Sequence, residues 1–352
     1  MKKACMGLLA WIACFPSILP GALVPDYQWV STQSIPSGGV ITETSGLVAS
    51  RNDTRLLWGH NDGPDSISLF AIRNDGKYLG KYILDSSTTY AMEDIAFGPG
   101  PVAGVNYIYL GLIGDNNETA AFRSFYRVAE PAIDVDKVPS SPDKAPIVNV
   151  SGAQLFKFKY PDKAHNCEAM FVDPFTGDLF LPVKSRTDPD PGKTGRVFRI
   201  AASDMKTGVT ITATHVATVT SRVNYVQSVG LTAADISSDG TKIIMKNPVE
   251  GFLWTRDPAT ETVAEVLSRN PTAPTYLGYG YDGVSHDPAN PKWDGFNSKD
   301  PGFQGFRGEA VGFTVDGWGF YAMPEGSAAK LSFFEAIKPQ SSASSRMWRQ
   351  LR

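Results

Sequence analysis

Acidic and polar residues recur at two positions of a repeated sequence pattern. The first position, at the start of an apolar run, holds Glu93, Asp94, Glu168, Asp235 and Glu309. The second, at the end of the next apolar run, holds His60, Asn61, Asp62, Asp115, Asn116, Lys184, Arg186 and Lys246. Converging carboxylates repel one another unless a hard cation, raised pKa values or nearby Lys and Arg offset their charge. Oxygen ligands suit Ca²⁺, and Mn²⁺ less strongly, so we expect a divalent cation, with Ca²⁺ preferred.

The residue types also suggest roles around such an ion. His60 lies beside Asp62, and this pair is predicted to handle protons as the catalytic residues. The predicted metal ligands are Glu93, Glu168, Glu309, Asp94, Asp115 and Asp235. The predicted substrate-binding residues are Asn61, Asn116, Lys184, Arg186, Lys246 and Arg307. Their Lys and Arg side chains favour an anionic substrate, such as a phosphoester or an acidic sugar.

A purely structural interpretation of the same residues stays open. Asn, Asp and Gly at strand ends make turns with their own side chains, which would explain "HNDG" and "GDNN". The glutamates could form a ring of ion pairs or hydrogen bonds. An acid at the start of an inner strand is nevertheless costly without a partner. Cys167, beside Glu168, is predicted to be a small buried residue rather than a nucleophile.

The elements that would position these residues are short β-rich runs. Five strand–turn–strand units recur, split by Asp-Gly, Gly-Asp and Pro turns. Their first runs are residues 45–50, 93–100, 168–175, 234–240 and 309–317. No long amphipathic helical pattern appears. Five such units predict an all-β chain with a single β-propeller, in which six blades are also possible. The alternative architecture is a β-sandwich.

Some strands of the predicted propeller come from unexpected places. The fifth unit lacks a last strand, and the run "YQWVSTQ" at 27–33 could supply it and close the ring. The run "TVAEVL" at 262–267 is assigned to the fourth unit. A sixth blade could lie in the irregular stretch from Pro271 to Gln304.

Propeller geometry brings the two polar positions together. The first strand of each blade lines the central channel and the second returns antiparallel, so both positions lie at one channel mouth. Aligning the units puts Glu93, Glu168 and Glu309 in one column, and Asp94 and Asp235 in the next. Because successive residues of a strand face opposite ways, the glutamates are predicted to face the channel. The two aspartates would then serve the blade interfaces.

Composition and termini narrow the class of protein. The chain has 352 residues, 42% hydrophobic, and a net charge of −3. This is ordinary globular composition without a basic stripe, so we expect no nucleic-acid partner, and we expect a monomer that binds an anionic small molecule or a polysaccharide. Residues 1–24 resemble a signal peptide, residues 25–338 the propeller and residues 339–352 a flexible tail.

These termini predict a secreted protein, extracellular or periplasmic, with no transmembrane segment. Lys2 and Lys3 precede an apolar run broken by Pro16 and Pro20, which suits a cleaved signal more than a spanning helix. Lipoprotein anchoring through Cys14 is the alternative. After residue 24 the chain holds Cys167 alone, so the mature protein cannot form an internal disulfide.

The repeated motifs resemble those of secreted bacterial β-propeller proteins, distantly those of phytase-like and TolB-like six-bladed propellers. The motifs are "ETSGLVASRNDTRLLWGHNDG", "MEDIAFGPG", "YIYLGLIGDN" with "YRV", "CEAMFVDPFTGDLFLPVKSR", "ADISSDGTKIIMKN" and "GEAVGFTVDGWGF", from Glu43 to Met323. The resemblance implies Ca²⁺ ions held by acidic residues near the channel and phosphate held by Lys and Arg. Two hypotheses follow: a metal-assisted hydrolase, or a non-catalytic extracellular binding propeller.

Overall fold

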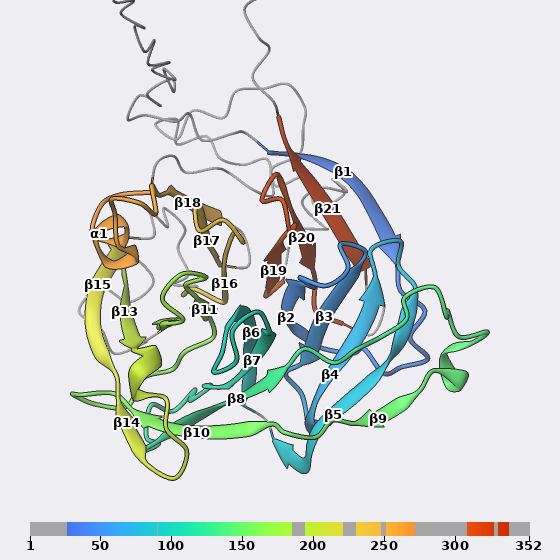
Figure 1. Cartoon of the computed structure of the whole chain (residues 1–352), viewed down its shortest axis with the longest axis horizontal. Helices are drawn as coiled ribbons and strands as arrows, with labels where there is room; N and C mark the ends of the chain where they lie inside the picture. Colours follow the sequence, from blue (N-terminus) through green and yellow to red (C-terminus); the bar gives the residue numbers. More distant parts are fainter. Residues whose placement is uncertain are drawn as a thin grey trace, which may run out of the picture.

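The computed structural model describes residues 27–89, 91–184, 194–220, 230–247, 251–271, 308–326 and 330–337. The predicted signal peptide and the predicted tail from residue 339 lie outside these residues. So does the stretch proposed for a sixth blade, apart from Pro271. Within the described residues, the strands form five separate sheets arranged around a common centre (Figure 1). The chain is therefore an all-β propeller with five blades.

Blades 1 and 2 each have four antiparallel strands and a fifth, parallel strand at the outer edge. Blade 1 contains β2 (Thr44–Ala49), β3 (Leu56–Asn61), β4 (Asp65–Arg73), β5 (Tyr78–Thr89) and the parallel β9 (Ile147–Asn149). Blade 2 contains β6 (Met92–Pro99), β7 (Asn106–Leu112), β8 (Arg123–Ala129), β10 (Gln154–Lys159) and the parallel β14 (Thr210–Thr212). Both parallel strands come from the segment that builds the following blade.

Among the described residues, the other three blades have fewer strands. Blade 3 contains β11 (Phe171–Val172), β12 (Leu179–Pro182), β13 (Thr194–Ile200) and β15 (Thr214–Thr220). Blade 4 contains β16 (Ala233–Ile236), β17 (Lys242–Lys246) and β18 (Gly251–Thr255). Blade 5 contains β19 (Ala310–Phe313), β20 (Gly319–Met323), β21 (Lys330–Ala336) and β1 (Tyr27–Ser34). Two short 3₁₀ helices, η1 (Pro142–Lys144) and η2 (Ala202–Asp204), lie in connections.

The inner strands form a closed ring around the channel. β2 contacts β6, β6 contacts β11, β11 contacts β16, β16 contacts β19, and β19 contacts β2. Because β16 and β19 touch directly, five blades complete the circle. The first and last parts of the described chain make the final blade together, since β1 pairs antiparallel with β21 from Tyr27 opposite Ala336 to Ser34 opposite Lys330. The predicted role of "YQWVSTQ" is confirmed.

The run assigned to the fourth unit as "TVAEVL" is a helix. It forms α1 (Val263–Leu267), in which the Thr262 side chain accepts from the Glu265 backbone N–H, and the Glu265 side chain accepts from the Thr262 backbone N–H. This capping box satisfies two helix-end donors that a strand would pair with a neighbour. Val263, Val266 and Leu267 are buried. α1 contacts β15 and β18, between blades 3 and 4.

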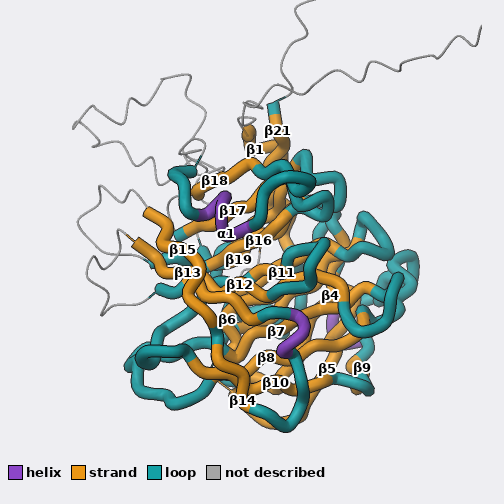
Figure 2. The backbone as a smooth tube through the Cα atoms, turned by 60° about the vertical axis from the view of Figure 1, so that its left-hand side comes forward, coloured by secondary structure: helices purple, strands orange, loops and turns teal. Residues whose placement is uncertain are grey.

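Apolar side chains between adjacent blades hold the ring together. In the described part of the chain, each of five buried clusters joins a pair of neighbouring blades. Trp58 of blade 1 packs with Ile95 and Leu110 of blade 2, for example. The parallel strands add hydrogen bonds at the rim, where β9 lies beside β5 and β14 beside β10 in both views (Figures 1 and 2).

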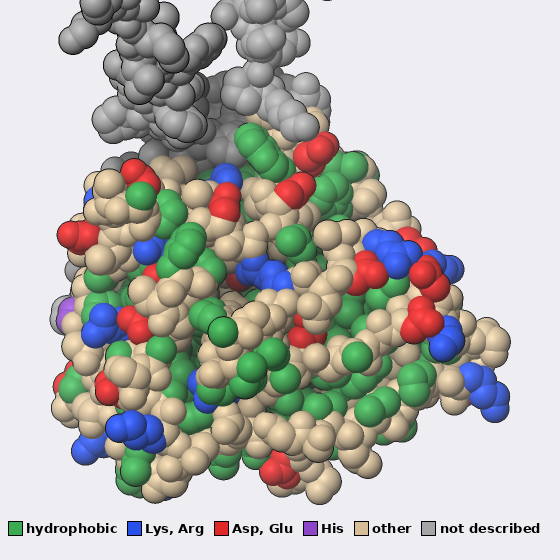
Figure 3. Space-filling model, in the orientation of Figure 1, with side chains coloured by type: hydrophobic (Ala, Val, Ile, Leu, Met, Phe, Trp, Pro, Cys, Tyr) green, Lys and Arg blue, Asp and Glu red, His purple; other side chains and the backbone are tan. Residues whose placement is uncertain are grey.

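The surface is chemically mixed. On the face seen in Figure 3, acidic and basic side chains lie interspersed among hydrophobic ones, with Lys or Arg side chains near the centre. Among the described residues, no helix has the length and apolar character needed to cross a membrane.

Candidate functional site

β-bulges at the start of inner strands determine which side chains reach the channel mouth. The register between β6 and β7 shifts between Met92 and Asp94, and the register between β2 and β3 shifts between Thr44 and Gly46. A bulge adds a residue to one strand and re-aims its side chain. Glu93 and Ser45 occupy the extra positions. The alternation of side chains along a strand, which was used to separate the glutamates from the aspartates, therefore does not hold at Glu93.

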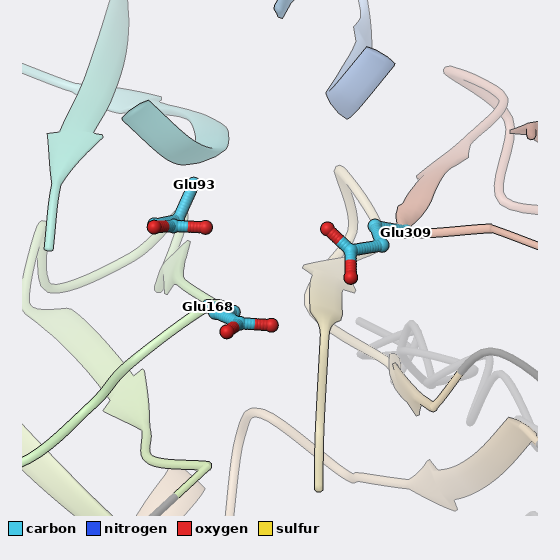
Figure 4. Close-up of side chains that lie close together, drawn as sticks. All are labelled: Glu93, Glu168 and Glu309. Atoms are coloured by element: carbon cyan, nitrogen blue, oxygen red, sulfur yellow. The ribbon is translucent and has the colours of Figure 1, made fainter. Parts of the chain in front are cut away.

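Three glutamates converge at this mouth. Glu93 comes from β6, Glu168 precedes β11 and Glu309 precedes β19, and one carboxylate oxygen of each lies within 4.8 Å of the others. Figure 4 shows Glu93 and Glu168 on one side of a shared space and Glu309 facing them from the other. Glu93 and Glu168 are each 4% exposed, and the Glu309 side chain is 15% exposed. We call these residues the glutamate triad.

Two members of the triad have polar partners. The Lys184 ammonium donates to Glu168 Oε2 and lies 4.0 Å from Glu309 Oε1. Asn166 Nδ2 donates to Glu168 Oε1 at 2.9 Å. The Ser45 hydroxyl donates to the Glu93 backbone carbonyl at 2.7 Å and lies 3.3 Å from Glu309 Oε2.

The Glu93 carboxylate differs from the other two. It accepts no hydrogen bond and makes no ion pair with any described residue, although it is almost fully buried. Gly114 makes room for it, since a Cβ at position 114 would lie 1.7 Å from Glu93 Oε1. A buried carboxylate without a partner is costly, so this position calls for a bound cation or a proton.

The pKa values of this group are raised. Burial, followed by repulsion from Asp62, Glu168 and Glu309, raises the pKa of Glu93 to about 9. Burial and then Glu325 raise the pKa of Glu309 to about 7. Burial and then Glu309 and Glu168 raise the pKa of Asp62 to about 6. Burial also raises the pKa of Glu168, against the opposing effect of Lys184. Without a cation, the group retains protons at neutral pH.

Asp94 and Asp235 lie deeper and fasten inner strands to one another. Asp94 Oδ2 accepts from the backbone N–H of Met170 at 2.7 Å and of Ala234 at 3.2 Å, across the channel. Asp235 Oδ2 accepts from the backbone N–H of Phe313 at 2.7 Å. Both are therefore engaged with backbone donors of other blades, and the structure does not bring either into the triad.

His60 and Asn61 are part of the blade rather than of the mouth. His60 is fully buried, its Nδ1 lies 3.2 Å from the Asn61 carbonyl, and burial lowers its pKa to about 4. Its Nε2 has no hydrogen-bond partner, and a Cβ at Gly46 would lie 2.4 Å from it. Asn61 Oδ1 accepts from the backbone N–H groups of Thr42 and Glu43. Asp62, in contrast, interacts electrostatically with the triad.

Asp115 and Asn116 lie one step outward from the triad. Asp115 Oδ1 pairs with Arg123 at 2.9 Å, and its Oδ2 accepts from the Ala120 backbone N–H at 2.8 Å. Asn116 Oδ1 accepts from Asn166 Nδ2 at 3.3 Å. Asn166 thus connects this loop with Glu168. Neither Asn166 nor Arg123 was predicted, because neither occupies a position that recurs in the sequence units. Ser45 does occupy such a position, since it aligns with the glutamates in the first unit.

The remaining predicted residues are Lys184, Lys246, Arg186 and Arg307. Lys184 lies at the triad, as described above. Lys246 is fully buried, donates to the Gly308 carbonyl, and has its pKa lowered to about 7 by burial. Arg186 and Arg307 lie outside the described residues.

Comparisons with known proteins add little at the level of function. No protein-family model and no curated protein sequence matches the chain. Among solved structures, it is similar to Kuenenia stuttgartiensis hydrazine synthase (11% identity, 84% of this chain and 72% of that chain, TM-score 0.34). It is also similar to the Dos1 propeller (10% identity, 88% of this chain and 95% of that chain, TM-score 0.34). The site is therefore interpreted from its own geometry.

Proposed function

We propose that this propeller binds a divalent cation, Ca²⁺ in preference, between Glu93, Glu168 and Glu309, and acts there on an anionic phosphoester or acidic sugar as a metal-assisted hydrolase. The Glu93 carboxylate carries the proposal. It is 4% exposed, has no polar partner among the described residues, and has two further carboxylates within 4.8 Å. Lys184 supplies one positive charge against three glutamates, and its contacts are with Glu168 and Glu309.

The spacing of the triad suits a large hard cation. An ion at the centre of three oxygens no more than 4.8 Å apart would lie at most about 2.8 Å from each, a limit that includes the roughly 2.3–2.6 Å of Ca²⁺–oxygen bonds. Mg²⁺ needs about 2.0–2.1 Å and near-ideal octahedral geometry, which Ca²⁺ does not. Carboxylate ligands without nitrogen or sulfur also favour Ca²⁺, and Mn²⁺ after it.

The chain's own residues support chemistry beside such an ion. When bound, a divalent cation lowers the pKa of its water and polarises a phosphoryl oxygen. Asp62, with a pKa of about 6, is mostly ionised at neutral pH and can accept a proton. Lys184 stands at the triad with 17% of its side chain exposed, where its ammonium can hold an anionic group.

Calorimetric titration with Ca²⁺, Mn²⁺ and Mg²⁺ tests the metal centre. We expect the wild type to bind Ca²⁺ and the variants Glu93→Gln and Glu168→Gln to lose binding. Glu335→Gln, an exposed carboxylate of β21, is the matched control and should bind like wild type. Turnover of a panel of phosphoesters and acidic polysaccharides should disappear with chelator and in both triad variants. Equal Ca²⁺ binding in wild type and triad variants would reject the proposal.

A second function is favoured by one observation. His60, predicted to handle protons, is fully buried in β3 against Gly46, so its imidazole is withdrawn from the mouth. A site with fewer proton-transferring groups suits a cation-dependent binding propeller that holds its anionic ligand without turnover. Ca²⁺ binding that depends on the triad, with ligand binding but no product from any substrate, would select this function over the hydrolase.

A further inference from the structure

Three β-turns lie next to one another on the side of the propeller opposite the triad. They connect the first strand of a blade to the second, and comprise residues 173–178 in blade 3, 237–241 in blade 4 and 314–318 in blade 5. Glu168 and Glu309 precede β11 and β19, whereas the turns follow these strands, so the inner strands separate the turns from the triad. We call five exposed or half-buried side chains of this region the turn patch: Phe175, Asp239, Lys242, Asp316 and Trp318.

The turns contact one another in the order of the blades, since β11, β16 and β19 follow one another around the centre (Figure 1). The Phe175 ring lies against Gly240, where a Cβ would come within 2.6 Å of a ring carbon. The Ser238 hydroxyl donates to the Val315 carbonyl. Gly240 has a φ of +64°, which glycine adopts without strain. The patch is therefore held in shape by contacts between blades 3, 4 and 5.

Two aromatic rings of the patch remain exposed to solvent. Phe175 is 61% exposed and Trp318 is 44% exposed. Lys242 Nζ lies over the Trp318 ring, 5.5 Å from its centroid, and the Phe175 ring rests on Gly240, so each ring is supported on one side. Neither ring packs against another aromatic ring in the described part of the chain. Exposed apolar side chains that gather in one place among polar groups mark interaction sites.

The charged side chains of the patch present both acceptors and donors. Asp239 Oδ1 accepts from the Thr241 backbone N–H at 3.0 Å, and Asp316 Oδ1 accepts from the Thr314 hydroxyl at 2.6 Å. The Oδ2 atoms of these two exposed aspartates have no hydrogen-bond partner among the described residues. The Lys242 ammonium donates to the Thr241 hydroxyl at 3.2 Å and carries two further N–H groups. Each turn thus fixes one carboxylate oxygen and leaves the other for a ligand.

This combination of groups suits a neutral saccharide. A sugar ring has an apolar face that packs on an aromatic ring, and hydroxyl groups that both donate and accept hydrogen bonds. Two carboxylates against one ammonium disfavour an acidic chain. A basic peptide is disfavoured because Lys242 already occupies the cation position over Trp318 and would repel it. Because blade 4 lies between blades 3 and 5, the two rings stand on either side of its turn, as a chain of several sugar units requires.

We propose that the turn patch binds a neutral polysaccharide. Phe175 and Trp318 stack on sugar rings, while Asp239, Asp316 and Lys242 bond their hydroxyl groups. This binding goes beyond the proposed function, since it uses the opposite face of the propeller and needs no cation. It would hold the protein on a neutral polysaccharide with the triad directed away from the attachment.

Affinity electrophoresis in EDTA, through gels that contain hydroxyethyl cellulose, xyloglucan, galactomannan or dextran, tests the patch. We expect at least one of these polysaccharides to retard the wild type, and Phe175→Ala and Trp318→Ala each to weaken binding about tenfold or more. Trp318→Phe, which keeps an aromatic ring, should retain part of the binding. Phe122→Ala is the matched control, because Phe122 is 43% exposed and has Lys157 Nζ 3.8 Å from its ring centroid, outside the patch. Calorimetry should give all four variants the melting temperature of the wild type.

The possible results separate this inference from the proposed function. Binding that persists in EDTA and in Glu168→Gln, but is lost in the two alanine variants, supports the patch even if the metal centre fails. Binding that requires Ca²⁺ or Glu168 would move it to the triad and overturn the inference. So would retardation that survives both alanine variants, an equal loss in Phe122→Ala, or no retardation by any of the four polysaccharides. Binding of a labelled oligolysine that depends on Trp318 and weakens with added NaCl would assign the patch to a basic peptide instead.

Discussion

Replacing Glu93 with Gln separates the effect of the buried carboxyl group on folding stability from its part in binding the cation. The pKa of Glu93 is raised to about 9, so in the cation-free protein its carboxyl group is protonated at pH 7. Each unit of a raised pKa corresponds to about 1.4 kcal/mol. An ionised Glu93 would therefore cost several kcal/mol, a large part of the 5–15 kcal/mol that typically stabilises a domain. Gln has the shape of the protonated acid and no charge.

Glu93→Gln should therefore match the cation-free wild type near pH 4 and be more stable than it at pH 7, by about 3 kcal/mol, because only the wild type must take up a proton on folding at pH 7. The wild type should gain about 2.7 kcal/mol at a Ca²⁺ concentration of 100 times Kd. For a chain of 352 residues this raises Tm by about 4 °C. The variant lacks one of three carboxylate ligands and should lose most of this shift. Differential scanning calorimetry in EDTA and in Ca²⁺ measures both quantities.

The pH dependence supplies an independent check of the same reasoning. Because the folded-state pKa of Glu93 lies above its ordinary value of 4.5, the folded protein binds more protons than the unfolded chain between about pH 4.5 and 9. Stability of the cation-free wild type should fall as pH rises through this window. Glu93→Gln should show a shallower fall. A variant that is no more stable than the wild type in EDTA at pH 7, or that keeps the full Ca²⁺ shift, would refute the argument.

Three further changes test other parts of the site. Gly114→Ala places a Cβ 1.7 Å from the Glu93 carboxylate and should weaken Ca²⁺ binding at least tenfold, about 1.4 kcal/mol, in a titration; unchanged affinity would show that the close approach is unimportant. Lys184→Met removes the competing ammonium and should raise Ca²⁺ affinity, so a lower affinity would contradict the competition. Asp94→Ala leaves three buried backbone N–H groups without their acceptor and should cost about 1–3 kcal/mol for each, measured by urea unfolding; stability equal to wild type would reject this bracing role.

The repeat made the fold and the glutamate column readable from the sequence. Equivalent positions of equivalent units must lie at equivalent places around a ring, so Glu93, Glu168 and Glu309 could be aligned without knowing any contact. The same alignment placed Ser45 in the column, although its lack of charge hid its part in the site. The alignment also separated Asp94 and Asp235 from the glutamates and assigned them to the blade interfaces, where they accept from backbone N–H groups of other blades. The bulge beside Asp94 could not be predicted, because it depends on the pairing of β6 with β7.

Burial and loop geometry were the other limits of sequence reasoning. "HND" looks like a reactive cluster, yet His60 lies over Gly46 inside the blade, a placement that depends on the facing strand. Asn166 and Arg123 belong to segments outside the repeated strands, so no pattern marks them. α1 was missed for a different reason. Thr262 and Glu265 have capping-box spacing, but a four-strand blade was expected at that point.

The parallel rim strands make completion of the sheets depend on chain order. Blade 1 receives β9 only after most of blade 2 has been synthesised, and blade 2 receives β14 only after most of blade 3. At the ring's closure the delay is longest, because β1 pairs with β21 near the other end of the described chain. β1, the first described strand in chain order, thus pairs only after β21, the last described strand, has been synthesised. Until then β1, which carries Trp29 and Val30, has an unpaired edge, and such edges are templates for pairing with another chain.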